Sequence, residues 1–183
     1  DCNSSLTPAD TAAILALDRF DLAMIEQPLT NDDLIDHAAL ARRLKTPLCL
    51  DESITSPERA RKADEIGACG YVNLKTGRLG GLTNAIAVHD VCASAGIPCW
   101  VGSMLESAVG QGPSIALATL ANIGYPGDLF PSARFYETDL AAPEIELSAP
   151  GTIAAPERPG HGFAPRPDRL AACTLQQVRL APT

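Results

Sequence analysis

The sequence predicts an α/β fold, specifically a partial (β/α)8 barrel of the TIM type, from three observations. Short apolar segments alternate with segments of helical pattern, which is typical of strands flanked by helices. The apolar segments are continuous, which indicates parallel strands covered on both faces. Four polar residues, Asp1, Glu26, Asp51 and Lys75, are separated by 25, 25 and 24 residues; the last three each end an apolar segment, and Asp1 would follow a strand that is absent here. A barrel places its active site at such strand ends.

Four strands and one weaker strand are expected along the chain. They cover residues 22–27, 47–51, 70–75 and 98–102, and the weaker one lies near 127–131. A complete barrel needs eight strands in about 250 residues. We therefore expect this chain to be the carboxyl-terminal part of a longer protein whose first barrel strands are absent here.

Five helices are expected between and after these strands. They cover residues 7–18, 32–44, 56–66, 82–95 and 108–121. The pairs Thr7-Pro8 and Ser56-Pro57 each supply an N-cap residue followed by a first-turn proline. The helix over 32–44 carries acids in its first turn and arginines in its last, as the helix dipole favours.

The alternation stops beyond residue 141. Residues 143–167 contain six prolines, which predicts an extended segment with short strand pieces. We therefore divide the chain into residues 1–140, the carboxyl-terminal part of the barrel, and residues 141–183, a proline-rich segment that packs on the barrel or on a capping domain.

Composition and charge argue against several classes of protein. The net charge of −8 and the lack of a basic patch argue against binding to nucleic acid. No apolar run approaches the roughly 20 residues that span a bilayer, and no signal peptide is recognisable, so we expect a cytoplasmic protein without a membrane partner. The six cysteines lack C-x-x-C spacing, which favours reduced, mostly buried thiols over disulfides or a zinc site.

Three carboxylates at consecutive strand ends, from Asp1, Glu26 and Asp51, would repel one another without a cation. Mg²⁺ prefers oxygen ligands and keeps positions for water or substrate, so these residues are the expected metal ligands, with Mn²⁺ as a possible substitute. Taken singly, Glu26 could form a strand-end salt bridge and Asp51 could be an N-cap or turn residue. Their joint spacing favours the metal site.

Lys75 lies one strand further round the expected barrel. A lysine held near a dication in a partly dry cleft gives up its proton more easily, which suits a general base. Taken alone, it could also be a solvated loop lysine. A base beside a hard cation fits abstraction of a proton next to a carboxylate, where the developing enediolate needs electrostatic stabilisation.

Five short segments resemble the enolase superfamily. They are DCN at 1–3, IEQPL at 25–29, CLDES at 49–53, NLKTGRLGG at 73–81 and GSMLESAVG at 102–110. Within the superfamily they resemble the muconate-lactonising subgroup, and in it the o-succinylbenzoate synthases and N-acylamino acid racemases. The resemblance extends from Asp1 to about Leu140.

The resemblance implies roles for individual residues. The three carboxylates named above would bind Mg²⁺, and Lys75 would be one of two opposed acid/base lysines. Three further residues would line the substrate pocket: Asn3, Ser103 and Met104. The family's K-x-K motif, which carries the second lysine, and its capping domain have no counterpart in this sequence, so this chain alone is expected to be inactive.

Several functions stay open at this point. The resemblance implies a lyase or isomerase acting on a small carboxylate: dehydration to o-succinylbenzoate in menaquinone synthesis, racemisation of N-acylamino acids, or both, in a homo-oligomeric full-length protein. A muconate cycloisomerase is the alternative. A dipeptide epimerase is disfavoured because residues 127–140 lack an Asp-x-Asp motif. The alternative of another class is an inactive fragment or pseudoenzyme that serves as an assembly module.

Overall fold

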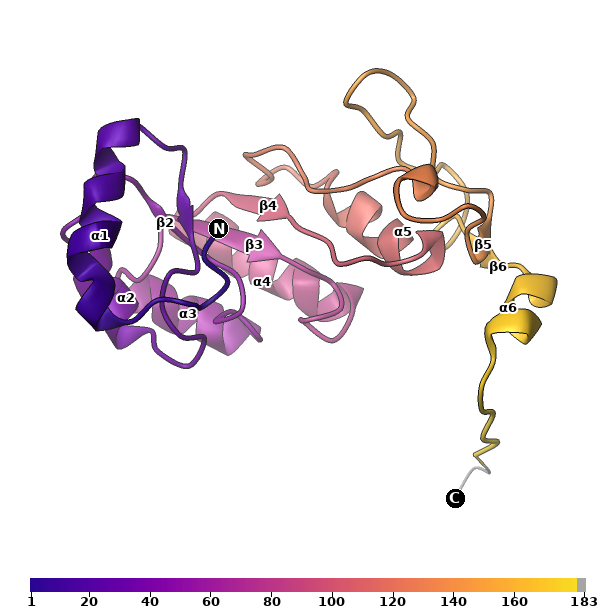
Figure 1. The fold of residues 1–183 in the computed structure, drawn as a ribbon, viewed down its shortest axis with the longest axis horizontal. Coiled ribbons are helices and arrows are strands. Elements are labelled where there is room, and N and C mark those ends of the chain that lie inside the picture. Colours follow the sequence, from indigo (N-terminus) through magenta and orange to yellow (C-terminus); the bar gives the residue numbers. More distant parts are fainter. Residues whose placement is uncertain (181–183) are drawn as a thin grey trace.

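A computed structural model describes residues 1–180 of the chain. Figure 1 shows an elongated molecule with a parallel sheet near its middle, the amino-terminal helices on one side and α5 with the carboxyl-terminal segment on the other. The first helical segment is split into η1 (Pro8–Asp10), α1 (Thr11–Leu15) and η2 (Ala16–Phe20), where one helix was expected. Thr7 occupies its N-cap position and Pro8 follows at the first helical position, as predicted.

Four parallel strands form the sheet in the order in which they occur along the chain. They are β1 (Ile25–Glu26), β2 (Leu48–Leu50), β3 (Tyr71–Leu74) and β4 (Cys99–Val101). Each strand is hydrogen-bonded to the next, and helices connect them. This arrangement confirms the predicted parallel α/β fold and the four principal strands, although each is shorter than expected.

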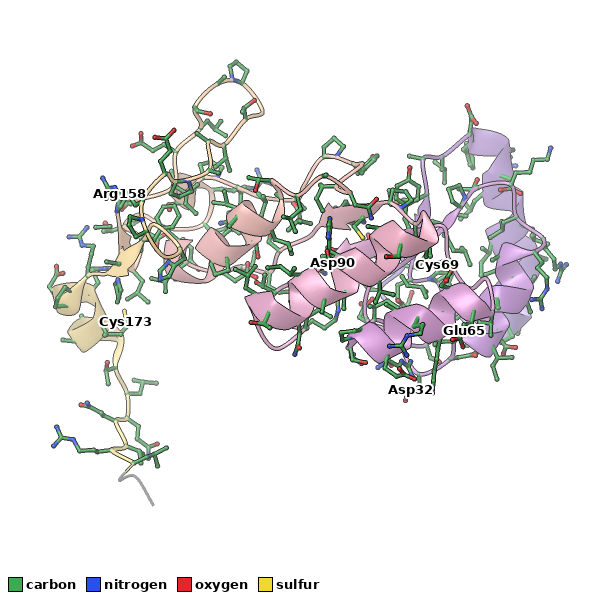
Figure 2. The ribbon with its side chains drawn as sticks, turned by 180° about the vertical axis from the view of Figure 1, so that it is seen from behind. Asp32, Glu65, Cys69, Asp90, Arg158 and Cys173 are labelled. Carbon is green, nitrogen blue, oxygen red and sulfur yellow. The ribbon has the colours of Figure 1, made fainter. Side chains whose placement is uncertain are left out.

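Helices follow or separate the strands. They are α2 (Ile35–Ala41), α3 (Pro57–Glu65), α4 (Leu82–Ala95) and α5 (Ala108–Leu117). Ser56 caps α3 by accepting a hydrogen bond from the Arg59 amide at 3.2 Å, which confirms the predicted start of this helix. Helix α4 has the predicted bounds and ends at Gly96, whose φ of +70° is easily adopted by glycine. Helices α3 and α4 pack side by side (Figure 2).

The prediction of a fifth strand near 127–131 is wrong. Ile123 instead forms an isolated parallel bridge with Cys99, and the Asp128 amide donates to a carbonyl of β4 at 2.9 Å. Pro126 lies between these two contacts and has no N–H to donate. The chain therefore touches the edge of β4 at two separate points and forms no continuous ladder.

The two faces of the sheet differ in character. Val72 and Leu74 of β3 are buried in the core formed with α2, α3 and α4, so Asn73 between them points to the opposite face. The same alternation turns Trp100 of β4 away from this core, and its indole N–H donates to the Cys49 sulfur at 3.2 Å. The strands are thus less uniformly apolar than expected, and the face away from the helices carries polar groups.

The carboxyl-terminal segment packs on α5. Strand β5 (Ala141–Ala142) pairs with β6 (Ala164–Pro165) in antiparallel fashion, and Phe163 is buried in a small cluster with residues of α5. A short 3-10 helix, η3 (Ser132–Arg134), precedes this segment. Helix α6 (Pro167–Cys173) and residues 174–180 extend away from the rest of the molecule (Figure 1). The division of the chain at residue 140 stays a prediction.

All six cysteines are free, as predicted. Three of them are fully buried: Cys49, Cys92 and Cys99. Cys173 is exposed on α6 (Figure 2). No helix within residues 1–180 is long and apolar enough to cross a membrane.

Candidate active site

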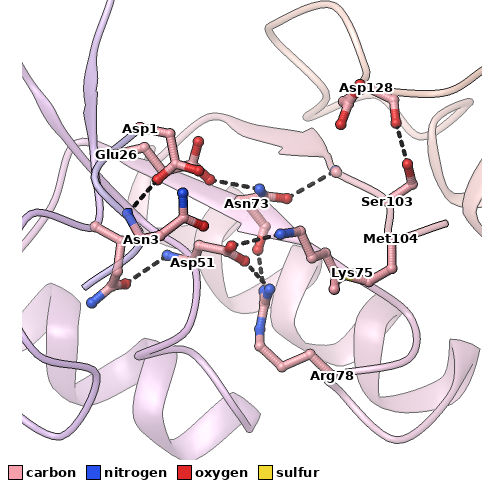
Figure 3. A network of polar contacts seen from close by, with 12 residues as sticks. Asp1, Asn3, Glu26, Asp51, Asn73, Lys75, Arg78, Ser103, Met104 and Asp128 are labelled. Carbon is pink, nitrogen blue, oxygen red and sulfur yellow. Dashed lines mark hydrogen bonds and ion pairs between the residues drawn. The ribbon is translucent and has the colours of Figure 1, made fainter. Parts of the chain in front are cut away.

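The carboxyl ends of the strands bring polar side chains together, as Figure 3 shows. Residues 1–6 run beside the end of β1, where the Cys2 amide donates to the Glu26 carbonyl at 3.0 Å and the Ser4 amide to the Gln27 carbonyl at 2.8 Å. These bonds place Asp1 next to β1, although its side chain is exposed and accepts from the Asn3 amide at 2.8 Å.

Asp51 lies at the end of β2 between two cations. The Lys75 ammonium lies 2.6 Å from Asp51 Oδ2, and the Arg78 guanidinium contacts Asp51 Oδ1. The Asp51 side chain is only 2% exposed. A buried carboxylate requires such partners, because transfer from water without compensation is costly. The structure thus joins two of the predicted site residues, Asp51 and Lys75, in one ion pair.

Arg78 holds the turn after β3 in place. Besides Asp51 it donates to the Ile54 carbonyl at 2.9 Å and to the Asn73 carbonyl. Burial lowers the pKa of Arg78, and the Asp51 carboxylate opposes this effect. Because guanidinium stays charged in proteins, Arg78 acts here as a fixed cation with several directed donors. Arg78 was not predicted from the sequence as a site residue, although its position three residues after Lys75, in the turn that follows β3, places it near the expected site.

Glu26, at the end of β1, is buried with a single side-chain donor. Asn73 Nδ2 donates to Glu26 Oε1 at 2.7 Å, and Asn73 Oδ1 accepts from the Gly102 amide at 2.8 Å. Burial raises the pKa of Glu26; the Asn73 hydrogen bond lowers it and the Asp51 carboxylate raises it further. Glu26 is therefore a carboxylate in an environment that a positive charge would stabilise.

Gly102 allows this packing because it has no Cβ. A Cβ at this position would lie 2.6 Å from Asn73 Nδ2 and 2.8 Å from Lys75 Cε. Neither Asn73 nor Gly102 was expected in the site. Asn73 could have been found, because it is the polar residue inside β3 and lies two positions before Lys75, on the same side of the strand.

The donor chemistry fits a hard cation, but three carboxylates are not gathered around one point. Within residues 1–180 no group of three histidine, cysteine, aspartate or glutamate side chains has the arrangement of a metal site. Glu26 and Asp51 reach the same edge of the sheet; burial is the main cause of the raised pKa of Glu26, and the nearby Asp51 carboxylate raises it further. The assignment of Asp1, Glu26 and Asp51 as ligands stays a prediction.

A cavity of about 380 Å³ opens at these strand ends. Its lining consists of Asn3, Asp51, Glu52, Lys75, Gly77, Arg78, Met104 and Glu106. Two of the three residues expected to contact substrate, Asn3 and Met104, are thus beside Lys75. The third, Ser103, donates its hydroxyl to the Asp128 carbonyl at 2.6 Å (Figure 3). All three substrate contacts stay predictions.

Comparison with known proteins shows relatives along nearly the whole chain. A family model described as Enolase C-terminal domain-like matches residues 1–169. An o-succinylbenzoate synthase from Geobacillus kaustophilus is 50% identical over 163 residues, which cover 89% of this chain and 43% of the relative. An N-succinylamino acid racemase from Amycolatopsis is 47% identical over 178 residues, which cover 97% of this chain and 48% of the relative. The chain therefore spans less than half the length of these relatives.

The fold is also shared with solved structures. The structure of an enolase-superfamily member from Listeria innocua superposes with a TM-score of 0.87 at 39% identity, covering 93% of this chain and 46% of the other. Together with the family match, this likeness confirms the resemblance to the enolase superfamily and the prediction that the chain forms part of its barrel domain.

Proposed function

The chain belongs to the enolase C-terminal domain-like family, and we propose that the full-length protein abstracts the proton α to a carboxylate with the help of Mg²⁺. The substrate would be a succinylbenzoate precursor, which loses water, or an N-acylamino acid, which is racemised. The o-succinylbenzoate synthase and the N-succinylamino acid racemase among the relatives support these two choices.

One observation carries the proposal. The Lys75 ammonium lines the cavity and pairs with Asp51 at 2.6 Å, at the end of the strand next to β2. Lys62, by contrast, lies on α3, is 60% exposed and pairs loosely with Glu58 at 3.6 Å. An amine that faces a cavity and is fixed by a buried carboxylate has the position that a general base requires.

Glu26 and Asp51, with Asp1 beside them, are the residues that would hold the cation. Bound Mg²⁺ supplies Lewis-acid stabilisation of negative charge on the substrate carboxylate. Carboxylate oxygens are ligands that this ion prefers, and the repulsion between Glu26 and Asp51 is relieved by a positive charge. Enolase-superfamily sites generally use Mg²⁺ to stabilise the ene-diolate.

Lys75 would move the proton. Its neutral amine takes the α-proton and becomes an ammonium group, while the electron pair of the C–H bond passes toward the substrate carboxylate. In racemisation a second acid, which the resemblance places upstream of Asp1, returns a proton to the opposite face. In syn dehydration the lysine would return that proton to the departing β-hydroxyl, which leaves as water while the electron pair of the enediolate forms the new C=C bond. Arg78 and Asn73 would keep Asp51 and Glu26 in place throughout.

Substitution of Lys75 in the full-length protein tests the proposal. Lys75→Ala should abolish racemisation in both directions, and Lys75→Arg should also fail because a guanidinium group does not deprotonate. Lys62→Ala on α3 is the matched control and should keep full activity, since its side chain is exposed and does not line the cavity. Near-normal kcat in Lys75→Ala, with Mg²⁺ still bound, would show that another group transfers the proton.

The same assay separates the enzyme from the alternative of an inactive assembly module. Full-length protein should be tested with both the succinylbenzoate precursor and N-succinylamino acids in the presence of Mg²⁺. Turnover of either supports the proposal. No turnover of either, together with absence of a K-x-K motif upstream of Asp1, favours the assembly module.

A further inference from the structure

Gln27 is a buried residue that the proposed mechanism does not use. It follows Glu26 at the end of β1 and is 0% exposed. Its φ is +36°, a left-handed conformation that is unfavourable for a residue with a Cβ. Burial of a polar amide and an unfavourable backbone angle both need compensation, so the contacts of this side chain are informative.

The Gln27 amide uses its full hydrogen-bonding capacity. Its oxygen accepts from the Asp51 amide at 2.9 Å and from the Ser53 amide at 3.2 Å. Its nitrogen donates to the Ser53 hydroxyl at 2.7 Å and to the Leu29 carbonyl at 3.2 Å. A side-chain amide offers two donors and two acceptor sites. Each of them is matched here, so the side chain has one defined orientation.

These bonds extend the contact between β1 and β2 beyond the end of the strands. The Gln27 backbone amide donates to the Cys49 carbonyl at 2.8 Å, which is the last backbone bond of this ladder. Asp51 is the first residue after β2, and its amide donates to the Gln27 side chain and not to the backbone of β1. The Gln27 carbonyl also accepts from Ser4, in the segment that begins at Asp1. One residue thus binds all three segments that carry the carboxylates.

We propose that Gln27 is a positioning residue that sets where Asp51 lies relative to Glu26, and thereby sets the affinity of the cation site. The inference rests on the proposed function, because it needs that cation to bind. Glu26 is covalently next to Gln27, and the Asp51 backbone is hydrogen-bonded to the Gln27 side chain. A shorter side chain would release the Asp51 backbone while leaving every candidate ligand in the sequence.

The test compares two buried glutamines that are shortened in the same way. Gln27→Asn keeps the amide but is too short to reach the backbone amides of Asp51 and Ser53. Gln111→Asn is the matched control: Gln111 is 1% exposed, and its amide oxygen accepts from the Phe130 amide at 2.7 Å, outside the candidate site. Both variants should lose stability in chemical denaturation with chelator present. Titration of each full-length protein with Mn²⁺ alone, by calorimetry, separates them.

Gln27→Asn should weaken Mn²⁺ binding by about tenfold or more, as changes behind metal ligands do, while Gln111→Asn should bind as the unchanged protein does. If Gln27→Asn binds Mn²⁺ as tightly as the unchanged protein does, the inference about Gln27 is wrong and the proposed function is unaffected. Failure of the unchanged protein to bind Mn²⁺ overturns the proposed function and the inference together.

A milder variant covers the case in which Gln27→Asn does not fold. Ser53→Ala keeps Gln27 and removes only the hydroxyl that accepts from its amide nitrogen. The amide then loses one of the bonds that fix its orientation. Mn²⁺ affinity should fall severalfold, and an unchanged affinity overturns the inference.

Discussion

Gly102→Ala should damage both stability and activity, because the added methyl group enters the space of two site residues. The new Cβ would lie 2.6 Å from Asn73 Nδ2 and 2.8 Å from Lys75 Cε. Overpacking of this kind costs about 1–3 kcal/mol. If the Asn73 amide rotates away instead, its hydrogen bond to the Glu26 carboxylate is lost, which costs about 1.5–3 kcal/mol.

Rotation of Asn73 would relieve part of the overpacking, so the two costs do not add in full. We therefore expect the free energy of unfolding to fall by about 2–4 kcal/mol. Displacement of Lys75 by about 1 Å should also lower kcat by about 100-fold. Denaturation in urea and steady-state kinetics of the full-length protein measure these effects. Gly77→Ala is the matched control in the same cavity: a Cβ there meets nothing within 4 Å, so both quantities should stay near their original values. Equal stability and kcat in the two variants would refute the reasoning.

Three further predictions concern other contacts. His37 Nε2 accepts from the Leu29 amide, and burial lowers the pKa of His37. The contribution of neutral His37 to the free energy of unfolding should therefore be fully present above pH 6.5 and should decrease as the pH falls below it. His37→Gln should remove this pH dependence. Arg78→Lys should cost about 1–3 kcal/mol, because a buried carbonyl loses its donor; denaturation that matches the unchanged protein contradicts this. Asp139→Ala should cost about 2–4 kcal/mol, since buried Asp139 accepts from the Ala108 amide at the start of α5; a thermal shift assay checks it.

The sequence predicts those features that depend on neighbours along the chain. Thr7 and Ser56 act as N-caps because their partners lie within three residues. The spacing of Glu26, Asp51 and Lys75 locates the strand ends because each strand-helix repeat has nearly the same length. Local rules also explain the error near 127–131, where the only apolar pair, Leu129 and Phe130, follows Gly127 and Asp128, and prolines at 126 and 131 cannot donate to a ladder.

The contacts that complete the site depend on strand register, which the sequence does not show. The bond from Asn73 to Glu26 joins residues 47 positions apart, across the intervening strand β2. The bond from Arg78 to Asp51 joins residues 27 apart. Each bond requires the observed register between the strands. A shift by one position would move the Asn73 side chain to the other face of the sheet, into the core. Periodicity finds the strand but not its partner across the sheet.

Two amide side chains, Asn73 and Gln27, hold Glu26 and Asp51 in position without adding charge to the cavity. Asn73 donates to Glu26 while accepting from the Gly102 amide, and Gln27 accepts from the Asp51 amide while donating to β2's continuation at Ser53. A charged residue could provide only one of these two functions, because ammonium and guanidinium groups only donate and a carboxylate only accepts. Neutral amides can do both, so the electrostatics of the site are left to Glu26, Asp51 and the two cations beside them.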